Sequence, residues 1–404
     1  MSNIKNLSPN PRLGPGAELT AATLIVFMAT TGGIEAAAAD TSDDLSWRED
    51  GEEECSGLEP FFYDEAAVRA EHAVAEAAKE KLREKEARMK ARRDRREEAH
   101  TAAMNQIRDF DEKQEGEYYT RFCFADFSKF DLNKESRIRP MRYTNRVCKP
   151  GEMPYEMCEA INILYVDIVS SDVGFPLNVY GTVIARDSMD LKCVYLFHRD
   201  RDDSELINSR EEPLTLTGPK RGLALVDDAY VEIDLKIKDD GEEQQDRELS
   251  KGFVTIDGIA RRWLTDCVVE SRSLATRLST VEVVYGVVKD AVEATIAIQV
   301  LHGDFYGEIT ACTTTIRDCL VLFDSEWNGT RAGEGDMQLL RRVVAVYLKE
   351  SLFLTIADQT IGGDEAEKEI EFTPKVNGAG GDQDEITVGG ATLLVKVVWS
   401  IVDF

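Results

Sequence analysis

The sequence has few of the residues and none of the spacings that common catalytic and metal sites need. Only four of its 404 residues are histidine, and no two of its eight cysteines are separated by just two residues. This excludes a zinc ribbon and a thioredoxin-type redox pair. The chain has no Gly-x-Ser-x-Gly elbow, no His-Glu-x-x-His and no glycine-rich phosphate loop with a lysine after a strand. The sequence therefore assigns no catalytic, cofactor-binding or metal-binding residue.

Net positive charge and long apolar runs are missing as well. The formal net charge of −28 repels phosphates, which argues against a general affinity for DNA or RNA. A local exception is Lys79 to Arg96, with ten Lys or Arg against four acids, and a solvated helix face explains it best. The segment Ala21 to Ala39 resembles a poor signal peptide, but Glu35 interrupts it and it is too short to span a bilayer. Together with the irregular cysteine spacing, this favours the cytoplasm or nucleus over secretion.

Three segments precede the strand-rich part of the chain, and the first two end before residue 112. Residues 1–60 are rich in Ser, Gly, Ala, Asp and Glu without a sustained period, which predicts a disordered N-terminus. Residues 64–111 are Ala, Glu, Lys and Arg without Gly or Pro, which predicts a long charged α-helix. Leu82 and Met89 are one heptad apart, but Arg96 breaks the apolar seam at the next step, so a strong coiled coil is not expected.

We expect this helix to form independently of the strands and to act as a charged arm on which a protein partner can dock. Its large apolar residues are too few to bury a full face. Deleting residues 1–115 should then leave the melting temperature nearly unchanged. If it does not, Leu82, Met89 and Ile107 are the contacts responsible.

Residues 116–160 form an aromatic lead-in loop with six Phe or Tyr side chains between Tyr118 and Phe130. With the arginines nearby, these rings could stack nucleic-acid bases. A base-stacking platform needs a sheet face, however, and this segment has no strand alternation. We favour the second interpretation, a strap that packs its rings onto the strands that follow.

From residue 161 to 404 the pattern predicts an all-β, mostly antiparallel domain, either one large β-sandwich or two packed sandwiches. In Val231 to Lys238 apolar and charged residues alternate without exception, so Val231, Ile233, Leu235 and Ile237 share one face. Two-residue turns join several strands, as hairpins require. Only Gly258 to Thr276 is expected to form a short helix. The expected strands are 161–169, 177–186, 192–198, 222–226, 229–238, 281–288, 292–302, 307–315, 319–324, 338–348, 351–358, 368–373 and 391–402.

The strand region also suggests a duplication. Leu177 to Asp203 runs strand, turn, strand and then an acidic loop, Asp200-Arg201-Asp202-Asp203. Glu293 to Gly335 follows a similar course and ends in a second acidic loop, Asp324-Ser325-Glu326. Each acidic loop is followed by a long strand pair, so the two segments share one pattern.

The remaining candidates for chemistry are histidines and acidic clusters. His72 and His100 lie on the charged helix, where solvent exposure explains them, whereas His198 and His302 end strands near acids. A metal or acid–base role would need carboxylates to converge on these two histidines. Acidic clusters could also hold calcium, although none has an EF-hand spacing. These clusters are Asp187 with Asp190, Asp200 with Asp202 and Asp203, Asp227 with Asp228, and Asp239 with Asp240.

Several motifs resemble a plant family abundant in grasses, known only as domain of unknown function 6598. They are FPLNVYGTVIARD from Phe175, LTLTGP from Leu214, VEIDLKIK from Val231, AVEATI from Ala291, FTP from Phe372 and VWS from Val398. They span about residues 161–402, and Pro140-Met141-Arg142-Tyr143-Thr144 resembles the usual lead-in.

The family has no established activity. Its domain sometimes follows a ribosome-inactivating N-glycosidase domain, which implies a link to defence or stress. The toxin motif, Glu and Arg three residues apart, is not met by Val269-Glu270-Ser271-Arg272.

Two functions from different classes follow from these observations. The first is a non-catalytic binding or interaction module, because the strands are well specified and their loops can carry recognition. The second is an enzyme of unrecognised type, such as a hydrolase acting on RNA or glycan through acids in the sandwich loops. The position of the loop carboxylates relative to His198 and His302 discriminates between the two.

Overall fold

The computed structural model describes residues 64–144, 157–239, 246–329, 331–359, 366–376 and 381–402. The predicted disordered segment 1–60, including residues 21–39, lies outside the described residues. Every pairing between named strands of the described chain is antiparallel, which confirms the predicted fold class. Residues 99–404 belong to one compact unit, while the helix up to Glu98 belongs to another.

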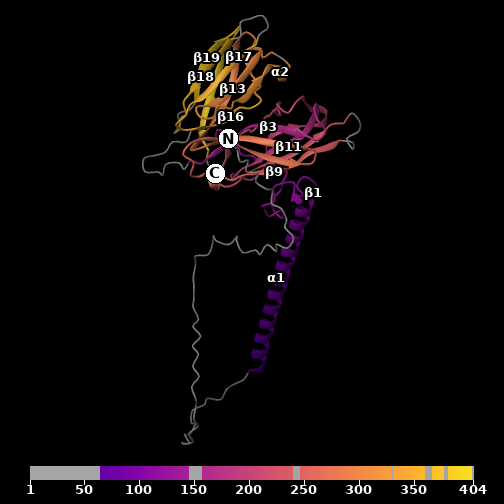
Figure 1. The fold of residues 1–404 in the computed structure, drawn as a ribbon. Helices are drawn as coiled ribbons and strands as arrows, with labels where there is room; N and C mark the ends of the chain where they lie inside the picture. Colours follow the sequence, from indigo (N-terminus) through magenta and orange to yellow (C-terminus); the bar gives the residue numbers. More distant parts are fainter. Residues whose placement is uncertain are drawn as a thin grey trace, which may run out of the picture. The chain divides into compact units, whose positions relative to one another are not determined.

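Two sheets form the first sandwich (Figure 1), and their inner faces enclose one apolar core. One sheet has the order β10-β11-β3-β7, and the other has the order β5-β4-β8-β9 with β6 added beside β4. Val231, Ile233, Leu235 and Ile237 of β8 all lie in the core, as their alternation predicted. The strands are β3 (Ala160–Ser171), β4 (Leu177–Arg186), β5 (Val194–Arg199), β6 (Glu205–Ile207), β7 (Leu223–Ala224), β8 (Ala229–Ile237), β9 (Arg247–Ile256), β10 (Val268–Thr276) and β11 (Ser279–Val288).

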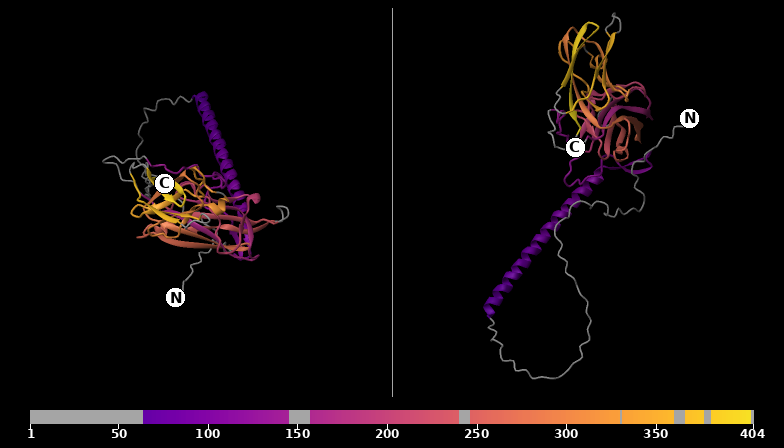
Figure 2. Two further views of the ribbon diagram at one scale, coloured as in Figure 1. Left: turned by 90° about the horizontal axis from the view of Figure 1, so that it is seen from above. Right: turned by 90° about the vertical axis from the view of Figure 1, so that its left-hand side faces the viewer.

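The second sandwich is built from the C-terminal strands, drawn orange to yellow in Figure 2. One sheet has the order β15-β12-β20-β19 with β16 also paired to β12, and the other has the order β14-β13-β17-β18. A short helix, α2 (Ser325–Asn328), follows β14. The strands are β12 (Ala291–His302), β13 (Gly307–Thr313), β14 (Leu320–Asp324), β15 (Gly335–Asp336), β16 (Val343–Tyr347), β17 (Leu352–Asp358), β18 (Ala366–Phe372), β19 (Gly381–Val388) and β20 (Ala391–Ile401).

The two sandwiches repeat one topology. The order β5-β4-β8-β9 corresponds to β14-β13-β17-β18, and the order β10-β11-β3-β7 corresponds to β19-β20-β12-β16. The prediction of a duplication therefore agrees with the strand order, but its alignment was displaced by one strand. The segment Leu177 to Asp203 matches β13 and β14 rather than a segment that begins at Glu293 in β12. The two acidic loops are still equivalent, because they follow β5 and β14.

Strand β3 is buried on both of its faces. Ile161 and Ile163 belong to the first core, whereas Ala160 and Leu164 belong to a core continuous with the second sandwich. A strand buried on both faces reads as a nearly unbroken apolar run, as this one does. The neighbouring Gly286 in β11 also touches the second sandwich, since a Cβ there would lie 2.6 Å from Ile316 Cδ1.

Polar side chains join the two sandwiches across this junction. The Asn162 side chain of β3 donates to Ala345 O and accepts from Ala345 N, both at 2.8 Å. The Asn162 amide thus takes the place of the backbone peptide group that a neighbouring strand would offer to β16 at Ala345. Arg341, just before β16, donates to Ile163 O at 2.6 Å and to Leu164 O at 2.8 Å. Leu164 has no register partner in β11, because a β-bulge interrupts the ladder there.

The described structure corrects the boundaries of the predicted helix. Helix α1 (Glu65–Gln106) ends five residues before the expected 111, and β1 (Arg108–Asp111) forms a hairpin with β2 (Gly116–Tyr119). None of the described α1 residues is buried, and no described helix is long and apolar enough to cross a membrane. Leu82 and Met89 are exposed, whereas Ile107 is buried.

The lead-in segment packs its rings onto the first sandwich, as the strap interpretation expected. Phe122 is buried against Tyr230 of β8, with ring centroids 4.7 Å apart, and Phe253 of β9 completes the cluster. Beneath the strap, Glu232 pairs with Arg186 at 2.8 Å, and the charge of that guanidinium lowers the pKa of Glu232 against the effect of burial. This explains why one charged residue of the alternating β8 pattern is buried rather than solvated.

The helix predicted over 258–276 was wrong. Only Ile259–Arg261 forms a 3-10 turn, and Val268–Thr276 is strand β10. Glu270 and Arg272 lie on the same side of β10 as Leu274, so the strand lacks apolar alternation. Glu270 accepts hydrogen bonds from Arg261 and from Tyr285 Oη, which gives it partners beside the core. Strands β1, β2, β6, β9, β15 and β19 were missed as well.

One cross-strand pair in the first sandwich joins two acids. Asp167 of β3 lies opposite Glu282 of β11. Burial, together with the charge of Glu282, raises the pKa of Asp167 to about 6. Like charges placed directly opposite each other destabilise a sheet.

Deleting residues 1–98 is expected to leave the melting temperature nearly unchanged, whereas deleting 1–115 should lower it by about 5 °C or more. The longer deletion removes Ile107, Asp111 and Gln114. Asp111 accepts from Arg277 N at 2.7 Å, and Gln114 donates to Ala275 O at 2.7 Å. Thermal unfolding of both truncations measures the difference, and equal melting temperatures would contradict it. The deletion of 1–98 is the matched control. The deletion of 1–115 tests the earlier expectation that these residues are dispensable for stability.

Replacing Asn162 by alanine should destabilise the protein by about 2–4 kcal/mol, because a buried N–H and a buried C=O of Ala345 lose their partner. Asn178→Ala is the matched control, since Asn178 lies in strand β4 with its side chain exposed. Urea unfolding of the two variants measures the effect. A similar midpoint for both would show that the Asn162 amide does not hold the edge of β16.

Asp167→Asn should raise the melting temperature at pH 8 and raise it clearly less at pH 5. The folded-state pKa of about 6 lies above the ordinary 3.8, so the folded protein favours the protonated carboxyl and loses stability as the pH rises from 3.8 to about 6. Thermal unfolding across this pH range tests the sign, with Asp234→Asn on β8 as the control. A gain that is equal at both pH values would contradict the assignment.

Candidate ligand-binding cleft between the sandwiches

A cleft of about 760 Å³ lies where the two sandwiches meet. Its volume falls in the range of sites that hold small molecules. Side chains from the end of β5, from β6 and from the following extended segment line it on the first sandwich, and β14, α2 and Leu340-Arg341 line it on the second. Both predicted acidic loops therefore contribute to one site, through Asp203 after β5 and Asp324 at the end of β14.

The wall from the first sandwich centres on Glu205 in β6. Glu205 Oε1 accepts from Thr215 N at 2.9 Å and from Thr215 Oγ1 at 2.6 Å. Its other oxygen, Oε2, is buried, accepts no hydrogen bond and lies 3.8 Å from Arg199 Nε. Burial raises the pKa of Glu205, while the bonds from Thr215 oppose that rise. Glu205 is therefore a carboxyl group with unused hydrogen-bonding capacity in the cleft wall.

Arg199 connects the two walls. Its Nη1 lies 2.6 Å from Asp203 Oδ2, and its guanidinium carbon lies 4.7 Å from the centre of the Trp327 ring. Trp327 belongs to α2, which begins where the Asp324 side chain accepts from Glu326 N at 2.8 Å and ends at Gly329 in a left-handed conformation. This capping holds a single helical turn that presents the indole to the cleft.

Arg341 contributes a buried cation to the second wall. It is 5% exposed, and no carboxylate forms an ion pair with it among the described residues. Its two terminal nitrogens donate to backbone carbonyls of β3, whereas Nε has no partner. Burial lowers the pKa of Arg341 to about 10, which still leaves the guanidinium charged at neutral pH.

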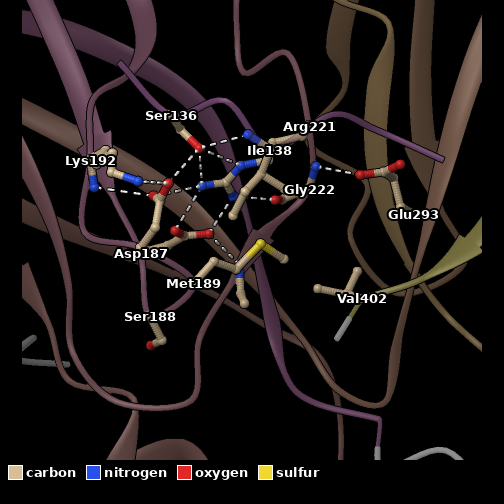
Figure 3. Close-up of polar contacts among 12 residues, drawn as sticks. Ser136, Ile138, Asp187, Ser188, Met189, Lys192, Arg221, Gly222, Glu293 and Val402 are labelled. Carbon is tan, nitrogen blue, oxygen red and sulfur yellow. Dashed lines mark hydrogen bonds and ion pairs between the residues drawn. The ribbon is translucent and has the colours of Figure 1, made fainter. Parts of the chain in front are cut away.

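A second polar cluster lies deeper in the junction and is shown in Figure 3. Arg221 forms a two-pronged ion pair with Asp187, at 2.5 and 3.0 Å, and also contacts Ser136 Oγ of the lead-in segment. The next residue, Gly222, donates its N–H to Glu293 Oε2 of β12 at 2.7 Å. These groups satisfy one another within the protein. The cluster therefore ties the lead-in, the first sandwich and the second sandwich together and leaves no open position for a ligand.

Burial raises the pKa of Glu293, and the two backbone N–H groups of Gly222 and Met141 oppose that rise. The Met141 N–H donates to the other oxygen, Oε1, at 2.7 Å. Both carboxylate oxygens thus hold backbone of segments outside the second sandwich, which is a structural role.

The structure does not bring the two candidate histidines together. His198 is exposed in β5 and stacks on Tyr195, with ring centroids 4.8 Å apart. His302 is exposed at the end of β12, with Nδ1 4.0 Å from Glu334. On the helix, His72 is exposed and His100 Nδ1 accepts from Phe127 N at 3.2 Å.

The acidic clusters proposed for calcium also have other contacts. Asp187 is paired with Arg221, Asp190 with Lys192, and Asp227 with Arg262. Asp240 lies outside the described residues. In the part of the chain that the structure describes, no group of three or more His, Cys, Asp or Glu is arranged to hold a metal ion.

Sequence reasoning missed the principal residues of the cleft: Arg199, Glu205, Trp327 and Arg341. None stands in a motif. The one available signal was the suggested duplication, in which each copy ends in an acidic loop, because these two loops meet at this site.

The fold and the cleft define a tandem antiparallel β-sandwich protein with a potential binding site at the junction of its halves. The sequence profile of the domain of unknown function DUF6598 matches residues 160–397, which include both sandwiches. The chain belongs to this family.

Other comparisons add little. No curated protein matches the chain. Structures of human GIVD cytosolic phospholipase A2, one of them in complex with methyl γ-linolenyl fluorophosphonate, align with 61% of this chain at 10% identity and TM-scores of 0.18 and 0.19. The aligned part spans 33% of those chains. TM-scores this low carry no inference about fold or activity.

Proposed function

We propose that the protein is a non-catalytic binding module whose ligand is a small molecule held in the cleft between the sandwiches. The observation that carries this proposal is the combination, in one cleft, of a partly exposed Trp327 and two wall residues, Glu205 and Arg341, each with one polar atom that forms no hydrogen bond with the described residues. Buried polar atoms without partners cost stability in the free protein. A ligand that supplies these partners recovers that free energy on binding.

The surroundings of the site support binding rather than turnover. His198 and His302 do not line the cleft, and no described metal cluster stands beside it. The enzyme alternative keeps one supporting observation, the raised pKa of Glu205, because a carboxyl group with a raised pKa can serve as a general acid. A test of binding must therefore also follow the chemical integrity of the ligand.

Helix α1 fits a separate role in docking a protein partner. Val68, Val74, Leu82 and Met89 are exposed on it, and no described residue of the helix is buried. The resemblance to a plant family whose domain can follow a ribosome-inactivating domain supports a place in stress or defence. The wide cysteine spacing supports the cytoplasm or nucleus.

Small molecules from four classes, namely neutral saccharides, carboxylic acids, amines and nucleosides, test the proposal with the full chain. Saturation-transfer NMR should detect binding by members of at least one class, and Trp327→Ala should weaken that signal. Trp263→Ala is the matched control, since Trp263 is 88% exposed and does not line the cleft.

The NMR spectrum of the bound compound should remain unchanged over hours of incubation. Conversion of the compound by wild-type protein but not by Glu205→Gln would favour the enzyme alternative. Binding that is insensitive to Trp327→Ala, or no binding by any class, would overturn the proposed site.

A further inference from the structure

We propose that the ligand of the cleft is a neutral polyhydroxylated ring compound, a saccharide. This inference rests on the proposed function and names the substrate class of the same site. It depends on the chemical kind of the unpartnered atoms, on the charges around them and on the aromatic surface beside them.

Two polar atoms in the cleft walls form no hydrogen bond with the described residues, although Glu205 Oε2 lies 3.8 Å from Arg199 Nε, and the two atoms are of opposite kind. Glu205 Oε2 is an acceptor when the carboxyl group is ionised and can donate when it is protonated, while Arg341 Nε is always a donor. A hydroxyl group both donates and accepts, so it can pair with either atom and with either protonation state of Glu205. A ligand with several hydroxyl groups on one rigid ring can satisfy both walls at once.

The charges of the cleft disfavour a ligand with a net charge of either sign. Asp203, Glu205, Glu212 and Asp324 line the walls of a chain whose net charge is −28, and they repel an anion. A cation would approach Arg199 and the buried guanidinium of Arg341, which has no carboxylate partner among the described residues that line the cleft. A neutral ligand avoids both penalties and can still form charge-assisted hydrogen bonds.

The aromatic side chain supplies a surface for the carbon face of a sugar ring. Trp327 is 37% exposed, and Arg199 covers part of its ring at 4.7 Å. The face of an aromatic ring carries negative charge density and attracts the weakly positive C–H bonds of a pyranose. Hydroxyl groups at the edge of that ring would then point toward the charged side chains of the walls. The volume of about 760 Å³ suits a short oligosaccharide.

Isothermal titration of the full chain with di- and trisaccharides of glucose, xylose, mannose and galactose tests this inference. At least one of them should bind at millimolar affinity or tighter. Trp327→Ala and Glu205→Gln should each weaken the affinity for that saccharide by about tenfold, which corresponds to the loss of one stacking contact or one hydrogen bond. Trp263→Ala should bind as the wild type does. If circular dichroism shows that Glu205→Gln does not fold, Trp327→Ala alone tests the inference. The Trp327 side chain is partly exposed, so its removal is expected to leave the protein folded.

A second measurement locates the bound sugar. Cys319 is exposed and lines the cleft, so a saturating saccharide should slow its alkylation by iodoacetamide, whereas alkylation of Cys123, outside the cleft, should be unaffected. Peptide mass mapping separates the two thiols. Binding of amines or carboxylic acids but of no saccharide would overturn the inference and leave the proposed function standing. Saccharide binding that neither protects Cys319 nor responds to Trp327→Ala would also overturn it.

Discussion

The junction between the sandwiches depends on backbone groups that neither sandwich can satisfy with its own strands. The bulge at Leu164 leaves carbonyl groups of β3 facing the second sandwich, and Arg341 donates to two of them. In the other direction, the edge of β16 lacks a neighbouring strand at Ala345, and the Asn162 amide takes that place. Because buried backbone groups must be paired, these two side chains fix how the halves fit together. The position of the cleft follows from that fit.

This arrangement also explains why a charged arginine is tolerated in the cleft wall. Arg341 is needed to complete the junction, so its charge is buried, and no carboxylate among the described residues neutralises it. Burial of an unpaired charge is costly, and two carbonyl dipoles recover only part of that cost. A side chain kept for structural reasons thereby leaves the cleft with a donor group that a ligand can use.

The sequence was sufficient for most of the fold because most strands bury one face or both. Strands β8 and β3 were predictable for these two reasons, alternation in one and an unbroken apolar run in the other. Strand β19 was not, because only Val388 among its residues is buried and its pairing with β20 supplies the rest. Strand β10 was mistaken for a helix because Glu270 and Arg272 occupy its inner side. The cleft could not be predicted from the sequence, because Glu205, Trp327 and Arg341 come together only when the two sandwiches are docked.

The repeated topology gives the cleft an unusual origin in evolutionary terms. If one ancestral sandwich had associated with an identical copy, the loops after β5 and β14 would have been the same loop seen twice, and a mutation in one wall would have changed both. Joining the copies in one chain removes that constraint. One wall could then acquire Glu205 on an added short strand, while the other acquired Trp327 on a capped helical turn. Two identical copies could not form such an asymmetric site, whereas two copies joined in one chain can.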